Sequence, residues 1–152
     1  MCTYCGCEAI GSIGRLMAEH TAIINTLTAL RQACESGDGD AVREAARHVA
    51  THLDPHTGKE EHGIFAVLSE QDDLFAGHVS SLCAEHTMLD ALLADIAGGA
   101  HHRAGEFENA LHDHIDKEDN GLFPAAAIAL DGPDWERVDE LEAAFGTAAH
   151  GH

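Results

Sequence analysis

Apolar residues recur every three or four positions along most of the chain, and clusters of glycine divide this pattern into segments. Such steps place side chains on one face of an α-helix, whereas strands alternate every second residue. The pattern predicts four long helices, at about residues 8–35, 40–70, 72–97 and 101–130, and a short fifth helix near Pro133. Four amphipathic helices with short connections favour an all-α, up-down-up-down four-helix bundle.

A chain of 152 residues fits a single domain. We expect a cysteine-rich segment at residues 1–9, the bundle at residues 10–130, and a C-terminal helix with a histidine-containing tail at residues 131–152. Pro55 interrupts the second predicted helix, so we expect either a kink there or a break, with Asp54 capping a new helix. The last helix has an apolar stripe that suits packing on the bundle: Trp135, Val138, Leu141 and Phe145.

Charge and composition narrow the function. Eight Lys and Arg stand against 27 Asp and Glu, a formal net charge of −19, so we expect no nucleic-acid or membrane partner. The chain has no apolar run long enough for a membrane span and no basic, apolar start typical of a secretory signal. Five cysteines, unevenly placed, favour a reducing cytoplasm over a disulfide scaffold. Thirteen histidines beside many carboxylates are typical of metal binding.

Each of the four long apolar stripes contains polar residues at positions where a core normally has leucine. The first and third helices each place one histidine there. The second and fourth each place a histidine and, one turn later, a glutamate on the same face. The residues are His20, His56, Glu60, His86, His114 and Glu118. Burying such groups without partners would cost several kcal/mol each, and a bound metal would remove that cost.

The two halves of the chain repeat this pattern. Ala-Glu-His-Thr occurs at residues 18–21 and again at 84–87, and His-x-x-x-Glu begins related segments at 56–65 and 114–123. At about 1.5 Å per residue, the four histidines fall within about 6 Å of one height in the bundle. A lone histidine in a stripe is usually a hydrogen-bonded core residue, but four in register favour a metal site. Nitrogen and oxygen ligands suit iron, manganese or zinc. Ferritin-like di-iron proteins would instead show Glu-x-x-His, which this chain lacks.

These motifs resemble the hemerythrin family, in its bacterial HHE cation-binding branch, over about residues 10–128. The Met-Cys-x-Tyr-Cys-Gly-Cys start is similar to a short actinobacterial group within it. The resemblance implies two iron ions with an oxo or hydroxo bridge, held by histidines and two bridging carboxylates. It implies that the six core residues are the ligands. It also implies reaction with dioxygen, nitric oxide or peroxide, for which an electron donor is needed.

The chain departs from oxygen-carrying hemerythrins at two positions. Those proteins have a second histidine one turn before the third-helix ligand, where this chain has Leu82. They also use an Asp five residues after the fourth-helix histidine, which corresponds to Asp119, but we favour Glu118 because it mirrors Glu60 and lies on the stripe. Four imidazoles and two bridging carboxylates would fill eight of twelve positions around two octahedral ions. A bridging oxygen would fill two more, and open positions are typical of catalytic metal sites.

We therefore expect redox detoxification of dioxygen, nitric oxide or peroxide. One alternative is a sensor of oxygen, nitric oxide or iron that has no turnover. The other is a structural bundle that holds zinc. His52 or His78 is a candidate for the missing ligand or for the second shell. The acidic neighbours of the ligands either orient the imidazoles or form an exposed acidic face: Glu19, Glu61, Glu85 and Asp119.

The N-terminal cysteines form a separate motif. Cys2, Cys5 and Cys7 have a spacing that suits zinc, copper(I) or disulfide exchange. If the fifth helix folds back, His150 or His152 would supply a fourth ligand. We expect either a second metal site, with zinc as the candidate ion, or a redox site, or a terminus without a role.

Overall fold

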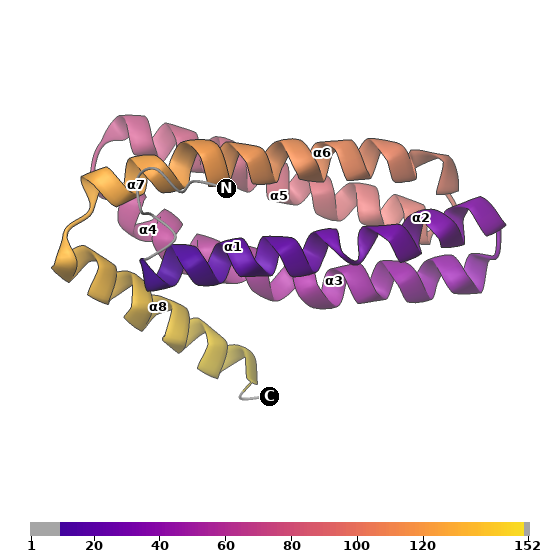
Figure 1. Ribbon diagram of the computed structural model, residues 1–152, viewed down its shortest axis with the longest axis horizontal. Coiled ribbons are helices and arrows are strands. Elements are labelled where there is room, and N and C mark those ends of the chain that lie inside the picture. Colours follow the sequence, from indigo (N-terminus) through magenta and orange to yellow (C-terminus); the bar gives the residue numbers. More distant parts are fainter. Residues whose placement is uncertain (1–9, 151–152) are drawn as a thin grey trace.

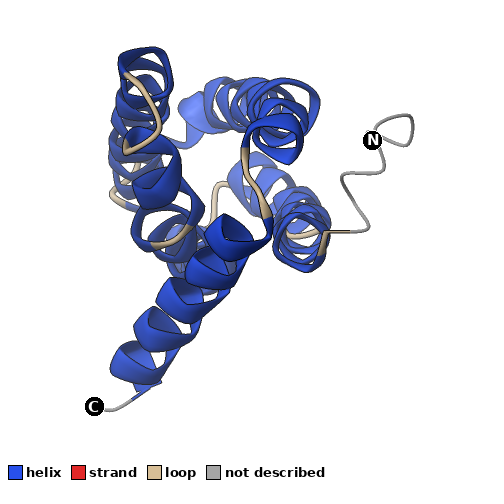
Figure 2. Cartoon of the chain, turned by 90° about the vertical axis from the view of Figure 1, so that its left-hand side faces the viewer, coloured by secondary structure: helices blue, strands red, loops and turns tan. Residues whose placement is uncertain are grey.

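The computed structural model describes residues 10–150, which are helical and contain no strand. The first two long helices of the bundle are each divided, into α1 (Gly11–Ile24) and α2 (Leu27–Ser36), and into α3 (Gly39–His62) and α4 (Ile64–Ser69). The third is α5 (Asp73–Ala97). The fourth consists of η2 (His101–Arg103), α6 (Ala104–Lys117), η3 (Glu118–Leu122) and α7 (Phe123–Ala129). We call each of these four long segments, made of one or more helices in series, a rod. The four rods alternate in direction, which confirms the predicted up-down-up-down bundle (Figures 1 and 2).

Local sequence explains where the helices begin and end. The Asp38 carboxylate accepts hydrogen bonds from the backbone N–H groups of Asp40 and Ala41 and so caps α3, while Asp72 caps α5 in the same way. Gly37 ends α2 with a φ of 74°, which glycine adopts without strain. Helix α3 continues through Pro55, so the predicted alternative of a new helix capped by Asp54 is wrong. Among residues 10–150, no helix is long and apolar enough to cross a membrane.

The apolar core has two parts, one on each side of a polar layer. One part includes Met17, Phe65, Leu82 and Leu122, and the other includes Ile23, Leu53, Leu89 and Leu111. The six candidate ligands lie between these two sets on all four long helices. The polar layer is therefore enclosed by packed apolar side chains at both ends.

Helix α8 (Gly132–His150) packs beside the end of the bundle that contains α4 and α7, as its apolar stripe predicted (Figure 1). It is longer than the short helix expected from the sequence, at 19 residues. Val138 is fully buried, and Ser12 donates a hydrogen bond of 2.6 Å to the buried carboxylate of Glu142. Arg15 of α1 contacts Glu142 and Asp139 of α8, so polar contacts also fix this helix to the bundle.

Gly58 of α3 makes room for the Phe145 ring of α8. A Cβ at position 58 would lie 2.2 Å from Phe145 Cζ, far inside contact distance. We expect Gly58→Ala to lower the free energy of unfolding by about 1 kcal/mol or more through overpacking. In the Phe145→Ala background the same change should instead raise the free energy of unfolding, because alanine is more favourable than glycine within a helix by about 1 kcal/mol. Urea unfolding of the four proteins in this cycle measures both signs, and equal effects in the two backgrounds would contradict the docking of α8 on Gly58.

Candidate metal centre

The structure brings the six candidate ligands together in the polar layer. They form two groups in which the ligand atoms lie within 4.8 Å of one another: His20, His56, Glu60 and Glu118 in one, and Glu60, His86, His114 and Glu118 in the other. All six side chains are buried, and the two glutamates are completely enclosed. Each half of the centre thus has two histidines, and both halves share the same two carboxylates.

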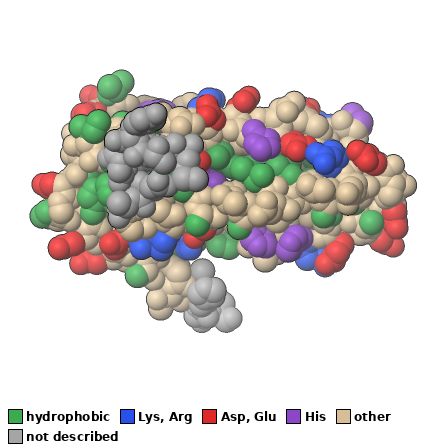
Figure 3. All heavy atoms as spheres, in the orientation of Figure 1, with side chains coloured by type: hydrophobic (Ala, Val, Ile, Leu, Met, Phe, Trp, Pro, Cys, Tyr) green, Lys and Arg blue, Asp and Glu red, His purple; other side chains and the backbone are tan. Residues whose placement is uncertain are grey.

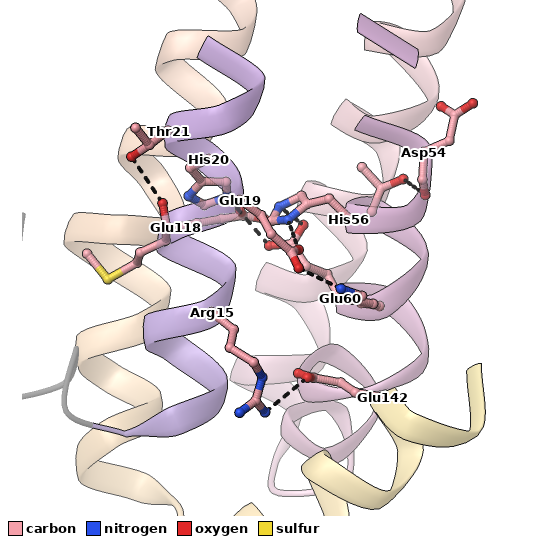
Figure 4. A network of polar contacts seen from close by, with 12 residues as sticks. Arg15, Glu19, His20, Thr21, Asp54, His56, Glu60, Glu118 and Glu142 are labelled. Atoms are coloured by element: carbon pink, nitrogen blue, oxygen red, sulfur yellow. Dashed lines mark hydrogen bonds and ion pairs between the residues drawn. The ribbon is translucent and has the colours of Figure 1, made fainter. Parts of the chain in front are cut away.

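The two carboxylates span the halves. Glu118 places Oε1 2.8 Å from His20 Nε2 and Oε2 3.1 Å from His114 Nε2. Glu60 Oε1 lies 3.3 Å from His56 Nε2 and 3.2 Å from His86 Nε2. Figure 4 shows the His20 and His56 rings reaching toward each other from α1 and α3. Glu118, and not Asp119, is therefore the fourth-helix carboxylate at the centre.

The outward nitrogen of every ring donates to a carboxylate. His56 Nδ1 lies 2.8 Å from Glu19, and His114 Nδ1 lies 2.9 Å from Glu85. His86 Nδ1 lies 2.6 Å from Glu61, and His20 Nδ1 lies 2.8 Å from Asp119. An ionised carboxylate only accepts hydrogen bonds, so these four contacts hold the proton on Nδ1. The four acidic residues therefore orient the imidazoles, as carboxylates hydrogen-bonded to metal-bound histidines do.

Neutral rings would leave acceptors facing acceptors. A neutral ring whose one proton is held on Nδ1 presents the lone pair of Nε2 inward, toward the shared carboxylates, and His86 Nε2 lies only 3.1 Å from His114 Nε2. Four buried atoms there have no hydrogen-bond partner: His56 Nε2, both carboxylate oxygens of Glu60, and Glu118 Oε2. Buried polar atoms are rarely left unpaired, because desolvation is costly. Cations at the two halves would satisfy these atoms, so the residues fit a two-metal centre.

The pKa values of the buried histidines and of Glu118 also show that this layer favours positive charge. Burial would lower the pKa of His20, but hydrogen bonds to Asp119 and Glu118 outweigh it and raise that pKa to about 9. Burial also opposes charge on His56, whose pKa is nevertheless raised to about 10, chiefly by the charge of Glu60 and a hydrogen bond to Glu19. Burial would raise the pKa of Glu118, yet the surrounding rings hold it well below its usual range. A metal that binds must therefore displace protons from the rings.

Two features of the centre were not expected from the sequence. The Phe65 ring stacks on His86 with centroids 5.7 Å apart, and the Phe123 ring stacks on His20 at 5.9 Å. The second feature is η3, a turn of π-helix that begins at Glu118. π-turns inside helices are frequent at functional sites. The only sequence signal for the phenylalanines was their matching place in the repeat.

Other predicted residues lie elsewhere. His52 is half-buried, contacts the backbone oxygen of His48, and belongs to neither group. His78 is exposed and also belongs to neither group. The proposed second site lies largely outside the described residues, since these exclude Cys2, Cys5, Cys7, His152 and the side chain of His150.

A narrow gap, too small for a water molecule, adjoins the rings on one side of the centre. Its lining combines three rings with apolar side chains: His20, His56, His114, Ile23, Leu53 and Leu111. Leu82, in the other part of the apolar core, is only 1% exposed and offers no ligand atom. The space beside the imidazoles is therefore narrow and mostly apolar.

A comparison with protein families matches residues 12–126 to the hemerythrin HHE cation-binding domain. The chain belongs to this family. The hemerythrin match runs from α1 into α7 and includes all six residues of the centre, while α8 lies beyond it. Searches of curated proteins and of solved structures gave no match. A cation-binding domain agrees with the buried, unpaired acceptors, so the two groups of this hemerythrin HHE domain are its candidate metal positions.

Proposed function

We propose that the protein holds two iron ions and reduces dioxygen, nitric oxide or peroxide with electrons from a separate donor. The observation that carries this proposal is the pair of four-residue groups that share Glu60 and Glu118 within a closed core. Shared carboxylates hold two cations close together, which suits reactions that need more than one electron. Iron would supply that redox chemistry, and zinc would not.

The residues around the centre support a small substrate. Four imidazoles and two carboxylates would leave coordination positions open on two bound ions, since Leu82 adds no further ligand one turn before His86. The gap beside His20, His56 and His114 excludes an organic substrate, and even a diatomic molecule would need the surrounding side chains to move apart. Its apolar walls favour uncharged ligands and keep bulk water away from the rings. Cys34 and Cys83 are free thiols, which suits a reducing cytoplasm.

Reactivity tests this proposal directly. Reduced, iron-loaded protein should oxidise within seconds in air and should consume added nitric oxide or peroxide, with no long-lived reversible oxygen spectrum. The reason is that Leu82 offers no ligand atom, which would leave a position open on a bound ion, and open positions favour reaction over carriage. Stopped-flow absorption on the anaerobically reduced protein, mixed in turn with the three oxidants, measures the rates.

Two controls make the outcome decisive. Zinc-loaded protein should show no reaction, since zinc has no redox chemistry. A stable, reversible oxygen spectrum would instead support a binding or sensing role without turnover. Absence of iron from protein purified under iron-rich, anaerobic conditions would overturn the proposed function altogether.

A further inference from the structure

The chain contains only two lysines, and both lie at the metal centre. The other six cationic side chains are arginines, in a chain with 27 Asp and Glu. Acidic side chains are scattered over the face of the molecule seen in Figure 3. Lys59 and Lys117 each directly precede one of the shared glutamates, Glu60 and Glu118. They therefore occupy matching places in the repeated His-x-x-Lys-Glu motif.

Each lysine contacts a carboxylate that orients a histidine. Lys59 Nζ donates to Glu19 Oε2 at 2.6 Å, while the other oxygen of Glu19 accepts from His56. In the second half, Lys117 Nζ donates to Glu85 Oε2 at 2.6 Å, while the other oxygen accepts from His114. The same series of contacts, from lysine to glutamate to histidine, therefore occurs once in each half of the centre and once in each half of the sequence repeat.

The other two imidazoles are oriented by carboxylates that no lysine contacts among the described residues. Glu61 and Asp119 orient His86 and His20, and neither carboxylate pairs with a Lys or Arg among the described residues. Each half of the centre therefore has one histidine on a lysine-paired carboxylate and one on a carboxylate without a lysine. This division provides an internal comparison within a single molecule.

Formal charges show what the lysines change. The two shared glutamates and the four outer carboxylates carry six negative charges, and two divalent ions carry four positive ones. The two lysines supply the remaining two. The contacts are partly exposed, and such ion pairs usually add little to stability. Their effect should therefore show in the geometry and electrostatics of the centre more than in the folding free energy.

We propose that Lys59 and Lys117 are positioning residues that fix Glu19 and Glu85 on His56 and His114 and thereby raise the reduction potential of the centre. A carboxylate that shares its charge with a lysine draws less strongly on the Nδ1 proton, which makes the imidazole a weaker donor to a metal. A fixed positive charge nearby also disfavours the more highly charged metal state. The second half of this inference rests on the proposed function, and the first half does not.

The positioning claim is tested on metal-free protein. In Lys59→Met, the His56 Nδ1–H signal in nitrogen-15 NMR should exchange with water at least about tenfold faster, because Glu19 is no longer held. The His20 and His86 signals should not change, and Lys117→Met should affect His114 in the same selective way. Lys59→Arg should restore slow exchange, since arginine keeps the charge and pairs with carboxylates. Unchanged exchange at His56 and His114 in the methionine variants would overturn the claim.

The potential is tested on iron-loaded protein by spectroelectrochemistry. Each methionine substitution should lower the ferrous-to-ferric ratio at a fixed potential by about threefold to tenfold, which is about 28 to 59 mV, and the arginine variants should restore it. The matched control is Arg43→Met, which removes the same charge from α3 at about 24 Å along the helix from Lys59 and should change the ratio by less than about twofold. Equal potentials in the wild type and the methionine variants would refute the tuning. If the wild type binds no redox-active metal, the proposed function and this tuning both fail, while the NMR experiment still decides the positioning.

Discussion

Removal of bound metal will lower the melting temperature by about 10 °C or more. The folded chain brings two glutamates and four imidazole nitrogens together in a core from which water is excluded. A ligand that binds the folded state but not the unfolded state stabilises the folded state by about 4 kcal/mol when its concentration is a thousandfold above its dissociation constant. In a domain of about 150 residues, each kcal/mol shifts the melting temperature by about 2–4 °C. Calorimetry of metal-loaded protein and of chelator-treated protein measures the difference.

The matched control for this experiment removes one of the two shared carboxylates. In Glu118→Gln, the side chain keeps its shape but loses the charge that both halves of the centre share. Chelator treatment should then change the melting temperature by less than about 3 °C, because less metal binding energy remains to be lost. Equal melting temperatures for loaded and stripped wild-type protein would show that the polar layer is stable without a cation and would contradict the metal centre.

The fold was predictable because burial imposes a regular spacing on each helix. Apolar residues spaced three and four positions apart predicted the four long helices of the bundle and α8, since every long helix has one face in the core. The interruptions within the rods were not predictable. The second rod breaks at Gly63, where a Cβ would lie 2.7 Å from the backbone oxygen of Lys59, and the fourth rod has its π-turn around the matching Gly121. These breaks are local changes of backbone geometry, which a periodic pattern of apolar residues does not specify.

The candidate ligands were predictable for a related reason. A histidine or glutamate in an apolar stripe is conspicuous, and the duplication of the stripe fixed which residues belong together. The partners of the outward ring nitrogens were not predictable, because Glu19, Glu61, Glu85 and Asp119 lie beside the stripes, where solvent-exposed acidic residues are also common. The structure shows that each one contacts a ring from a different rod, as Glu19 of α1 contacts His56 of α3. Pairing across rods depends on the order and rotation of the helices, which spacing along one helix does not give.

The duplication also explains why one substitution should affect a defined half of the centre. In His114→Ala, the group of Glu60, His86 and Glu118 retains three ligands, whereas the group around His20 and His56 keeps all four. We expect the metal content to fall from two ions per chain to one or fewer, and the melting temperature of the loaded protein to fall by about 5 °C or more, because metal binding energy contributes to folding. His20→Ala should produce a loss of the same size in the other half.

His102→Ala is the control for this substitution, since His102 is exposed in η2 and belongs to neither ligand group. Metal analysis by mass spectrometry and thermal unfolding of His114→Ala, His20→Ala and His102→Ala should therefore separate the first two from the third. A cavity alone would destabilise both the loaded and the stripped forms of His114→Ala equally, whereas loss of a ligand lowers mainly the stability of the loaded form. Two ions per chain in His114→Ala, with unchanged stabilisation by metal, would exclude His114 as a ligand and, because the ligand set follows from the repeat, would call for a different centre.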